Sequence, residues 1–107
     1  YTCGKKRKDE SCKYYQRAKG YSRMEQEMAN NMFKKILDRY GAVKTHREII
    51  DMGKSFEACP YEIMTKLLPH SNIVIADYYH LMIPSIREIL LKKGHMKIEN
   101  SIIIIDE

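Results

Sequence analysis

The sequence predicts an α/β fragment, mostly helical by residue count, in which a helical, cysteine-bearing half is joined to a βαβ unit of a parallel sheet. Apolar residues recur at helical spacing between residues 21 and 40, whereas two continuous β-branched runs, residues 72–76 and 101–105, flank an amphipathic stretch. Apolar strands without alternation are typical of parallel sheets that helices cover on both faces. We therefore expect two parts, residues 1–70 and residues 71–107.

The longest predicted helix covers residues 21–40. Ser22 and Glu25 form a capping box at its start, and Gly41 follows its end. Its apolar stripe is expected to be ordinary core and consists of Met24, Met28, Met32, Phe33, Ile36, Leu37 and Tyr40.

Two shorter helices are predicted before the first β-branched run. Thr45 and Glu48 form a second capping box, which opens a helix that Gly53 can end. Pro60 suits a first helical turn, so a further helix is expected over residues 61–68, closed before the next proline.

The amphipathic stretch of the second part predicts a helix over residues 84–93. Ser85 and Glu88 are interpreted as its capping box and Gly94 as its stop. A strand on either side of this helix completes a βαβ unit, which is right-handed in nearly all proteins.

Residues 1–20 are rich in Lys and Arg and show no helical or alternating period. The sequence predicts an irregular loop here. Such a stretch has too little apolar content to fold by burial alone, so a bound metal centre is the expected source of its order.

Composition narrows the classes of protein that remain. The 107 residues include 19 Lys and Arg against 14 Asp and Glu, a formal charge of +5, which favours a polyanionic partner but also fits a solvated basic face. No apolar run approaches the ~18 residues of a membrane span. Three cysteines argue for thiols or metal ligands in a reducing, cytoplasmic compartment. Tyr1 is expected to be a cut end.

The last two residues, Asp106 and Glu107, follow a predicted buried strand. Ligands of open α/β sheets bind at the carboxyl ends of strands. In nucleotide-hydrolysing motor enzymes an Asp in this place holds Mg²⁺ and a Glu acts on the attacking water. The alternative is a buried strand that simply ends in polar surface residues. The chain has no Gly-rich phosphate loop, so alone it is not expected to bind ATP in the usual way.

The cysteines form a second candidate site. Thiolates hold zinc and iron–sulfur centres, usually as sets of four, and the spacing here is not that of a zinc ribbon. Cys59 directly precedes a predicted helix N-terminus, whose partial positive charge favours a thiolate ligand. Three unrelated cysteines are the alternative, and a zinc site completed by a histidine is another. The residues concerned are Cys3, Cys12 and Cys59, with His46, His70, His80 and His95.

Cations interleaved with tyrosines form a third feature, which suits single-stranded nucleic acid because phosphates pair with the cations and bases stack on the rings. The alternative is a solvated loop with tyrosines packed at its base. The tract comprises Lys5, Lys6, Arg7, Lys8, Lys13, Tyr14, Tyr15, Arg17 and Lys19, and Tyr61, Tyr78 and Tyr79 extend it.

Three segments in order resemble one family, the XPD-type helicases. Residues 45–53 followed by Cys59-Pro60-Tyr61 resemble the stretch that delivers the family's last cluster cysteine. Residues 72–81, with their Asp-Tyr-Tyr-His-Leu ending, resemble the strand that comes next. The isoleucine run that ends in Asp106-Glu107 falls where the family has its DEAH box.

This resemblance implies an ATP-dependent DNA helicase of superfamily 2, moving 5′ to 3′, with a [4Fe–4S] cluster domain that borders the path of single-stranded DNA. It implies that Cys59 is the last cluster ligand, that Tyr61 lies near DNA, and that Asp106 and Glu107 are the metal-organising and catalytic carboxylates. ATP and Mg²⁺ would be bound by the full-length parent, together with the remainder of its chain. The fragment alone would be inactive, and the parent's role would be DNA repair, nucleotide excision repair in particular.

Two departures from the family's pattern concern its sites. Where the family often has a DNA-contacting Arg, this chain has Thr65 with Lys66 beside it. The family has four cluster cysteines and this chain shows three. Because Cys12 resembles the third ligand, Cys3 would be the second and the first would lie upstream; alternatively Cys3 is the first and one ligand has been lost.

A different class of function stays open from the sequence: a stand-alone zinc or metal-free module that binds single-stranded nucleic acid. A purely structural interaction piece built on the Met-rich helix is a third hypothesis. Codons for a Walker Gly-Lys-Thr/Ser upstream and for Ala-His downstream would favour the helicase.

Overall fold

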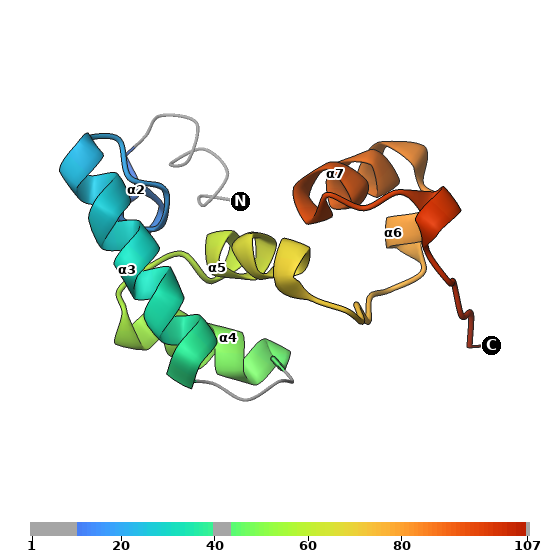
Figure 1. Ribbon diagram of the computed structural model, residues 1–107, viewed down its shortest axis with the longest axis horizontal. Coiled ribbons are helices and arrows are strands. Elements are labelled where there is room, and N and C mark those ends of the chain that lie inside the picture. The colour runs from blue at the N-terminus through green and yellow to red at the C-terminus, as the bar shows by residue number, and fades with distance from the viewer. Residues whose placement is uncertain (1–10, 40–43, 107) are drawn as a thin grey trace. The chain divides into compact units, whose positions relative to one another are not determined.

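The computed structural model describes residues 11–39 and 44–106, and it divides the chain into two compact units, residues 1–64 and residues 65–107. All regular secondary structure in the described residues is helical (Figure 1). Predicted features at Tyr40 and Gly41 lie outside the described residues.

The first unit is built from α2 (Lys13–Lys19), α3 (Arg23–Arg39), α4 (His46–Ser55) and the beginning of α5 (Pro60–Leu67). Helix α2 packs on α3. The largest fully buried side chains are Ile36, Met52 and Ile63, one from each of the three following helices. The smaller core residues beside them include Ala18, Ala29 and Ala58, which allow close approach of the backbones.

For residues 13–19, helix α2 corrects the expectation of an irregular loop over residues 1–20. Ala18 is buried, Arg17 and Lys19 lie in the last turn where cations favour the helix C-terminus, and the Gly20 amide donates to Gln16 at 2.8 Å. Gly20 ends the helix with φ of 71°, a conformation that glycine adopts without steric cost. The burial of Ala18 and the favourable residues at the helix end therefore favour a helix over residues 13–19.

Both capping boxes predicted in the first unit are confirmed. The Glu25 amide donates to Ser22 Oγ at 3.1 Å, and Glu25 Oε2 accepts from the Ser22 amide at 3.0 Å. The Glu48 amide donates to Thr45 Oγ1 at 3.3 Å, and Glu48 Oε2 accepts from the Thr45 amide at 2.8 Å. Each box satisfies two backbone donors that would otherwise be unpaired at a helix start.

These boxes predict a loss of stability in mild acid. Hydrogen bonds from Ser22 lower the pKa of Glu25 below its ordinary 4.5, and hydrogen bonds from Thr45 do the same to the pKa of Glu48. A carboxyl whose folded pKa is depressed contributes stability above pH 4.5, and this contribution disappears as the pH falls through the folded pKa. Chemical denaturation between pH 6 and pH 3 should therefore show a smaller pH dependence in Glu48→Gln. Equal pH dependence in the variant and the natural chain would contradict this reading.

The apolar stripe of α3 is only partly buried. Met32 and Ile36 belong to the core, but Met24 and Met28 are exposed, with 70% and 63% of their surface accessible. The expectation that the whole stripe is core is therefore wrong for the first two turns of the helix. Helical spacing identifies a common face, whereas the length of that face that is covered depends on neighbouring elements.

Gly53 does not end the second predicted helix, because α4 continues to Ser55. An added β-carbon at Gly53 would lie 2.5 Å from Pro60 Cγ and 3.0 Å from the Ala58 carbonyl oxygen. The glycine is therefore needed for the close approach of the start of α5. Helix α4 instead ends in a Schellman motif, in which the Glu57 amide donates to Lys54 and the Ala58 amide to Gly53, at 3.3 and 2.9 Å.

The second unit contains the short 3₁₀ helices η1 (Leu68–His70) and η2 (Ile98–Asn100) and the α-helices α6 (Tyr79–Met82) and α7 (Pro84–Gly94). Helix α7 packs on both α6 and η1. Helix α5 ends at Leu67, as expected before Pro69, and Pro69 lies inside η1.

Helix α7 confirms the helix expected from residue 84 but corrects its ends. Pro84 occupies the first turn, so Ile83 is the N-cap and the proposed Ser85/Glu88 capping box does not cap the helix. Gly94 is the last helical residue, and His95 takes the left-handed conformation with φ of 51°. The helix therefore ends one residue later than the sequence predicts.

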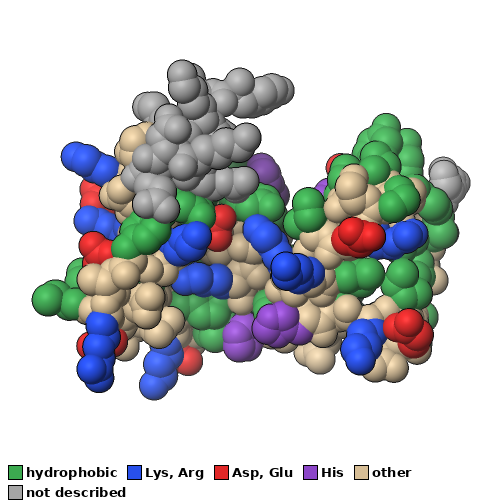
Figure 2. Space-filling model, turned by 90° about the horizontal axis from the view of Figure 1, so that it is seen from above, with side chains coloured by type: hydrophobic (Ala, Val, Ile, Leu, Met, Phe, Trp, Pro, Cys, Tyr) green, Lys and Arg blue, Asp and Glu red, His purple; other side chains and the backbone are tan. Residues whose placement is uncertain are grey.

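The predicted βαβ unit is not formed, since the described residues contain no strand. The backbone of the two β-branched runs is extended, and strongly exposed side chains alternate along each run with less exposed ones. Ile73 and Ile75 are 82% and 96% exposed while Val74 between them is 37% exposed, and Ile102 and Ile104 are 93% and 88% exposed while Ile103 is 45% exposed. Parallel strands need a neighbour for every backbone hydrogen bond, and neither run has one here. Hydrophobic side chains accordingly spread over the surface of this unit (Figure 2).

Among the described helices, none combines the length and the apolar content that crossing a bilayer requires.

Candidate functional site

Two of the three cysteines occupy equivalent places at the starts of two helices. The Cys12 carbonyl accepts the first helical hydrogen bond of α2 from Gln16 at 3.0 Å, and the Cys59 carbonyl accepts that of α5 from Ile63 at 3.0 Å. Both thiols are free and partly exposed. Each of these cysteines is thus the residue that directly precedes a helix.

A backbone hydrogen bond joins the two cysteine-bearing segments. The Cys59 amide donates to the Tyr14 carbonyl oxygen at 2.9 Å, although the two residues are far apart in sequence. Tyr14 lies in the first turn of α2, directly after Cys12 and Lys13. The structure therefore brings the segments of Cys12 and Cys59 together.

The complete ligand set stays a prediction, because Cys3 lies outside the described residues. Within residues 11–39 and 44–106, no three His, Cys, Asp or Glu side chains are grouped closely enough to hold a metal ion. His70, His80 and His95 belong to the second unit, and a zinc site completed by a histidine stays an alternative prediction.

The turn between α4 and α5, which delivers Cys59, is tied to α2 by an ion pair. Arg17 Nη1 lies 2.8 Å from Glu57 Oε2, and the two side chains are 55% and 69% exposed. An exposed pair of this kind is worth at most about 1 kcal/mol. Glu57 has φ of 50°, a left-handed conformation that costs a non-glycine residue roughly 1–2 kcal/mol.

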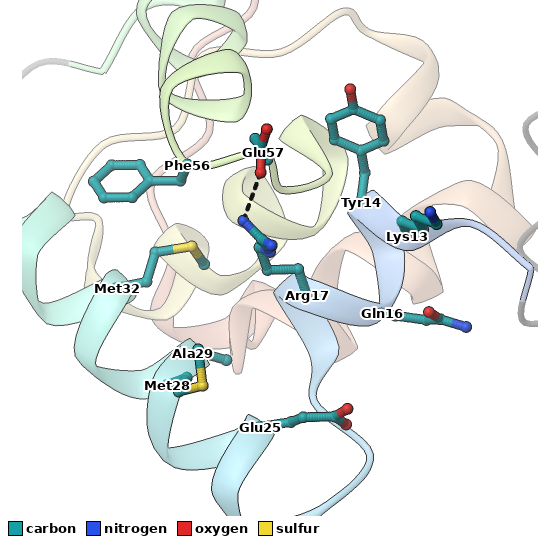
Figure 3. Close-up of a pocket in the computed structure, with 10 residues that line it drawn as sticks. All are labelled: Lys13, Tyr14, Gln16, Arg17, Glu25, Met28, Ala29, Met32, Phe56 and Glu57. Atoms are coloured by element: carbon teal, nitrogen blue, oxygen red, sulfur yellow. Dashed lines mark hydrogen bonds and ion pairs between the residues drawn. The ribbon is translucent and has the colours of Figure 1, made fainter.

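A pocket of about 750 Å³ surrounds this ion pair (Figure 3). Its apolar wall comes from α3 and the turn after α4, whereas α2 contributes polar and cationic side chains. The lining residues are Lys13, Tyr14, Gln16, Arg17, Glu25, Met28, Ala29, Met32, Phe56 and Glu57. The mixture of both charge signs does not single out one ligand.

The predicted DNA-binding residues are divided between the two units. Lys13 and Tyr14 are exposed on the first turn of α2, next to the Cys59 backbone, and Tyr61 is 40% exposed on the first turn of α5. Lys66 belongs to the second unit and is partly buried. The basic residues Lys5, Lys6 and Arg7 lie outside the described residues.

Thr65 stands where the resemblance leads one to expect a DNA-contacting Arg. Its side chain is buried, with 8% of the residue exposed, so it is part of the packing rather than a surface contact. Of the two neighbouring residues, Lys66 is therefore the one that retains access to solvent.

A lysine lies between two tyrosines where α2 meets α3. Lys19 Nζ donates to the Tyr15 hydroxyl at 3.0 Å and lies 5.3 and 5.9 Å from the ring centroids of Tyr15 and Tyr21. The hydrogen bond to Tyr15 raises the pKa of Lys19 above its ordinary value, and a cation near aromatic rings is attracted to them. Part of the predicted basic and aromatic tract is therefore an organised cluster rather than separate side chains.

Two further tyrosines form a contact pair in the second unit. The ring centroids of Tyr78 and Tyr79 are 4.5 Å apart with an interplanar angle of 35°, and both residues are more than half exposed. The hydrogen bond with Tyr79 raises the pKa of Tyr78. The pair presents aromatic surface to solvent at the start of α6.

The predicted catalytic carboxylates lie at the end of the second exposed run. Asp106 is exposed and follows extended backbone, and Glu107 lies outside the described residues. The structure thus leaves their roles as predictions.

Sequence reasoning missed α2 and the ion pair between Arg17 and Glu57. A signal for α2 was present, since residues 13–19 contain mostly good helix formers and Gly20 follows them. No sequence signal links Arg17 to Glu57, because the contact spans 40 residues.

Comparison with known proteins relates the chain to proteins that are named as DNA helicases. The family model described as DEAD_2 matches residues 1–107, and the chain therefore belongs to the DEAD_2 family.

Three relatives illustrate the similarity. The chain is 34% identical over 80 residues to the ATP-dependent DNA helicase CHL1 of Scheffersomyces stipitis, which covers 73% of this chain and 9% of that protein. It is 32% identical over 68 residues to the ATP-dependent DNA helicase CHL1 of Saccharomyces cerevisiae (strain YJM789), covering 64% of this chain and 7% of that protein. It is 27% identical over 60 residues to the regulator of telomere elongation helicase 1 homolog of Anopheles gambiae, covering 56% and 6%.

The matched part of the chain thus spans less than a tenth of the length of these curated relatives. No solved structure matches the chain significantly.

Proposed function

We propose that this chain is part of an ATP-dependent 5′–3′ DNA helicase. Residues 1–70 would form its [4Fe–4S] domain, beside the path of single-stranded DNA, and residues 71–107 would belong to the first motor domain. The observation that carries the proposal is the 2.9 Å hydrogen bond from the Cys59 amide to Tyr14, which joins two cysteine-bearing helix starts. Family membership supports the helicase part, and the parent's role in DNA repair follows from the resemblance alone.

The proposed cluster ligands are Cys3, Cys12 and Cys59, with a fourth ligand elsewhere in the parent. Cys12 and Cys59 fit this role because their thiols are free and lie at helix N-termini. When bound, such a cluster supplies covalent cross-links between segments that have little apolar surface of their own. The chain's contribution is to bring the sulfur-bearing segments together.

The proposed DNA path runs along the cations and tyrosines near Cys59. Lys13 would pair with phosphate, and the exposed rings of Tyr14 and Tyr61 would stack with bases. We assign the same phosphate-binding role to Lys5, Lys6, Arg7 and Lys66.

The second unit is proposed to complete a parallel sheet supplied by the remainder of the parent. Alternating exposure of the two β-branched runs supports this: one side of each run is partly covered by the unit itself, and the other is open. Extended apolar backbone of this kind is stable only when strands pair with it and helices cover it. Asp106 would then organise Mg²⁺ and Glu107 would act on the water that attacks ATP.

A charge on the open side of this sheet should destabilise the parent. Ile104→Lys places an ammonium where helices are proposed to cover the strand, and we expect a loss of about 2 kcal/mol or more in the free energy of unfolding. Glu99→Lys, at an exposed position in η2, is the matched control and should change stability little. Equal stability of both variants, measured by chemical denaturation, would argue against the sheet.

ATP hydrolysis tests the helicase assignment itself. The longer chain should hydrolyse ATP at a rate that single-stranded DNA increases, whereas the 107-residue piece should not hydrolyse it, because it lacks a Gly-rich phosphate loop. A coupled assay of both proteins at equal concentration makes the comparison. Robust hydrolysis by the short piece, or none by the longer chain, would contradict the proposal.

The alternative, a stand-alone module that binds single-stranded nucleic acid, is less well supported. Such a module would be expected to bury its isoleucines, but Ile73, Ile75, Ile102 and Ile104 are almost fully exposed.

A further inference from the structure

The turn before Cys59 carries a glutamate at a position that normally favours glycine. Glu57 follows the C-cap Phe56 and has φ of 50°. Its amide and that of Ala58 make the two hydrogen bonds of the Schellman motif that ends α4. Glycine forms this turn without the steric cost that a β-carbon brings. The presence of glutamate is therefore to be explained by what its side chain contacts.

The side chain of Glu57 contacts the helix that Cys12 begins. Glu57 Oε2 accepts from Arg17 Nη1 at 2.8 Å across a separation of 40 residues. Figure 3 shows Arg17 reaching from α2 toward the turn, with the ion pair drawn between them. Together with the hydrogen bond from the Cys59 amide to Tyr14, this makes two contacts between the cysteine-bearing segments, one from side chains and one from backbone.

The ion pair adds little to the net stability of the fold. Both partners are more than half exposed, and solvent screens such pairs strongly. The left-handed backbone at Glu57 costs a comparable amount, so the turn would be equally stable with glycine. What the pair does fix is where the turn before Cys59 lies relative to α2. Sites that bind metals depend on such supporting contacts to keep their ligands in place.

We propose that Arg17 and Glu57 are positioning residues, which hold the segments of Cys12 and Cys59 at the spacing that a shared cluster needs. The inference rests on the proposed function, because the cluster is itself part of that proposal. The inference adds to the proposed function two residues that do not touch the cluster. Replacing either of them should weaken retention of the cluster without removing a ligand.

The test uses the full-length protein, purified without oxygen. The variants are Arg17→Gln, Glu57→Gln and the charge-reversed double variant Arg17→Glu with Glu57→Arg. The control is Arg23→Gln, which removes another exposed ion pair, formed with Glu27 at 3.6 Å within α3. The readouts are iron and sulfide per chain, the rate at which a chelator removes iron, and the midpoint of chemical denaturation of the metal-free protein.

Each single variant at the proposed pair should lose iron several-fold faster than the natural protein, up to about fivefold, with a denaturation midpoint that shifts no more than in the control. The reversed pair should restore slow loss, and the control should match the natural protein. Equal rates in the natural protein and the single variants would overturn the positioning role while leaving the cluster in place. Fast loss in the reversed pair would overturn it as well. A natural protein without iron would instead contradict the proposed cluster, and this inference with it.

Discussion

Replacing Cys59 with serine in the full-length protein should remove the cluster and lower the rate of strand separation by at least about tenfold. A serine hydroxyl is a poor substitute for a thiolate, and Cys59 is the residue whose backbone joins α5 to the first turn of α2. Iron content, visible absorption and an unwinding assay measure the effect. Ser55→Ala, at the exposed end of α4, is the control and should retain iron and unwinding.

The damage from Cys59→Ser should also be local. Hydrogen exchange should become faster over residues 11–20, which have few apolar side chains to hold them, and stay unchanged over α7 in the second unit. Unwinding at the natural rate in an iron-free Cys59→Ser protein would contradict the role assigned to the cluster. Equal exchange over residues 11–20 with and without iron would contradict the proposed ordering of this segment.

Replacing Glu107 with glutamine should lower the rate constant for ATP hydrolysis by about 100-fold or more, while ATP binding is retained. Glutamine preserves the shape of the side chain but removes the carboxylate proposed to act on the attacking water, and such groups contribute on the order of 10²–10⁴ in rate. Measurement of kcat and of ATP affinity in the full-length protein separates hydrolysis from binding.

The matched control for Glu107 is Glu99→Gln in η2, which removes a nearby exposed carboxylate and should leave kcat unchanged. A Glu107→Gln protein that hydrolyses ATP at the natural rate would show that the isoleucine run ends in ordinary surface carboxylates.

Most features set by neighbours in sequence were predicted, although the capping box of Ser85 with Glu88 and helix α2 are exceptions. The capping boxes of Ser22 with Glu25 and of Thr45 with Glu48 form as expected, because each depends on residues three apart on one helical turn. Pro60 begins α5 for the same reason, since its fixed φ and missing amide suit a first turn.

Features set by contacts across the chain were not predicted. Gly53 looked like a helix stop but serves a close approach of Pro60, and Met24 and Met28 looked like core but have no described element covering them. The two β-branched runs have the composition of strands, yet a strand forms only when another strand supplies its hydrogen bonds. Sequence composition shows what such a segment can become, not whether its partner is present.

The candidate site shows the same division. The position of Cys59 before a helix could be seen from Pro60, and the structure adds that Cys12 occupies the same kind of position in α2. The pairing of Arg17 with Glu57 could not be predicted from the sequence, because neither residue belongs to a motif. The left-handed turn at Glu57 could not be predicted either, because such turns are usually signalled by glycine.

Iron and sulfide analysis of the full-length protein, purified without oxygen and accompanied by its visible absorption spectrum, tests the shared cluster most directly. The proposed function predicts about four iron and four sulfide per chain and a broad absorption band that disappears in Cys59→Ser. A colourless, well-folded protein with no iron, or one that holds a single zinc ion, would contradict it.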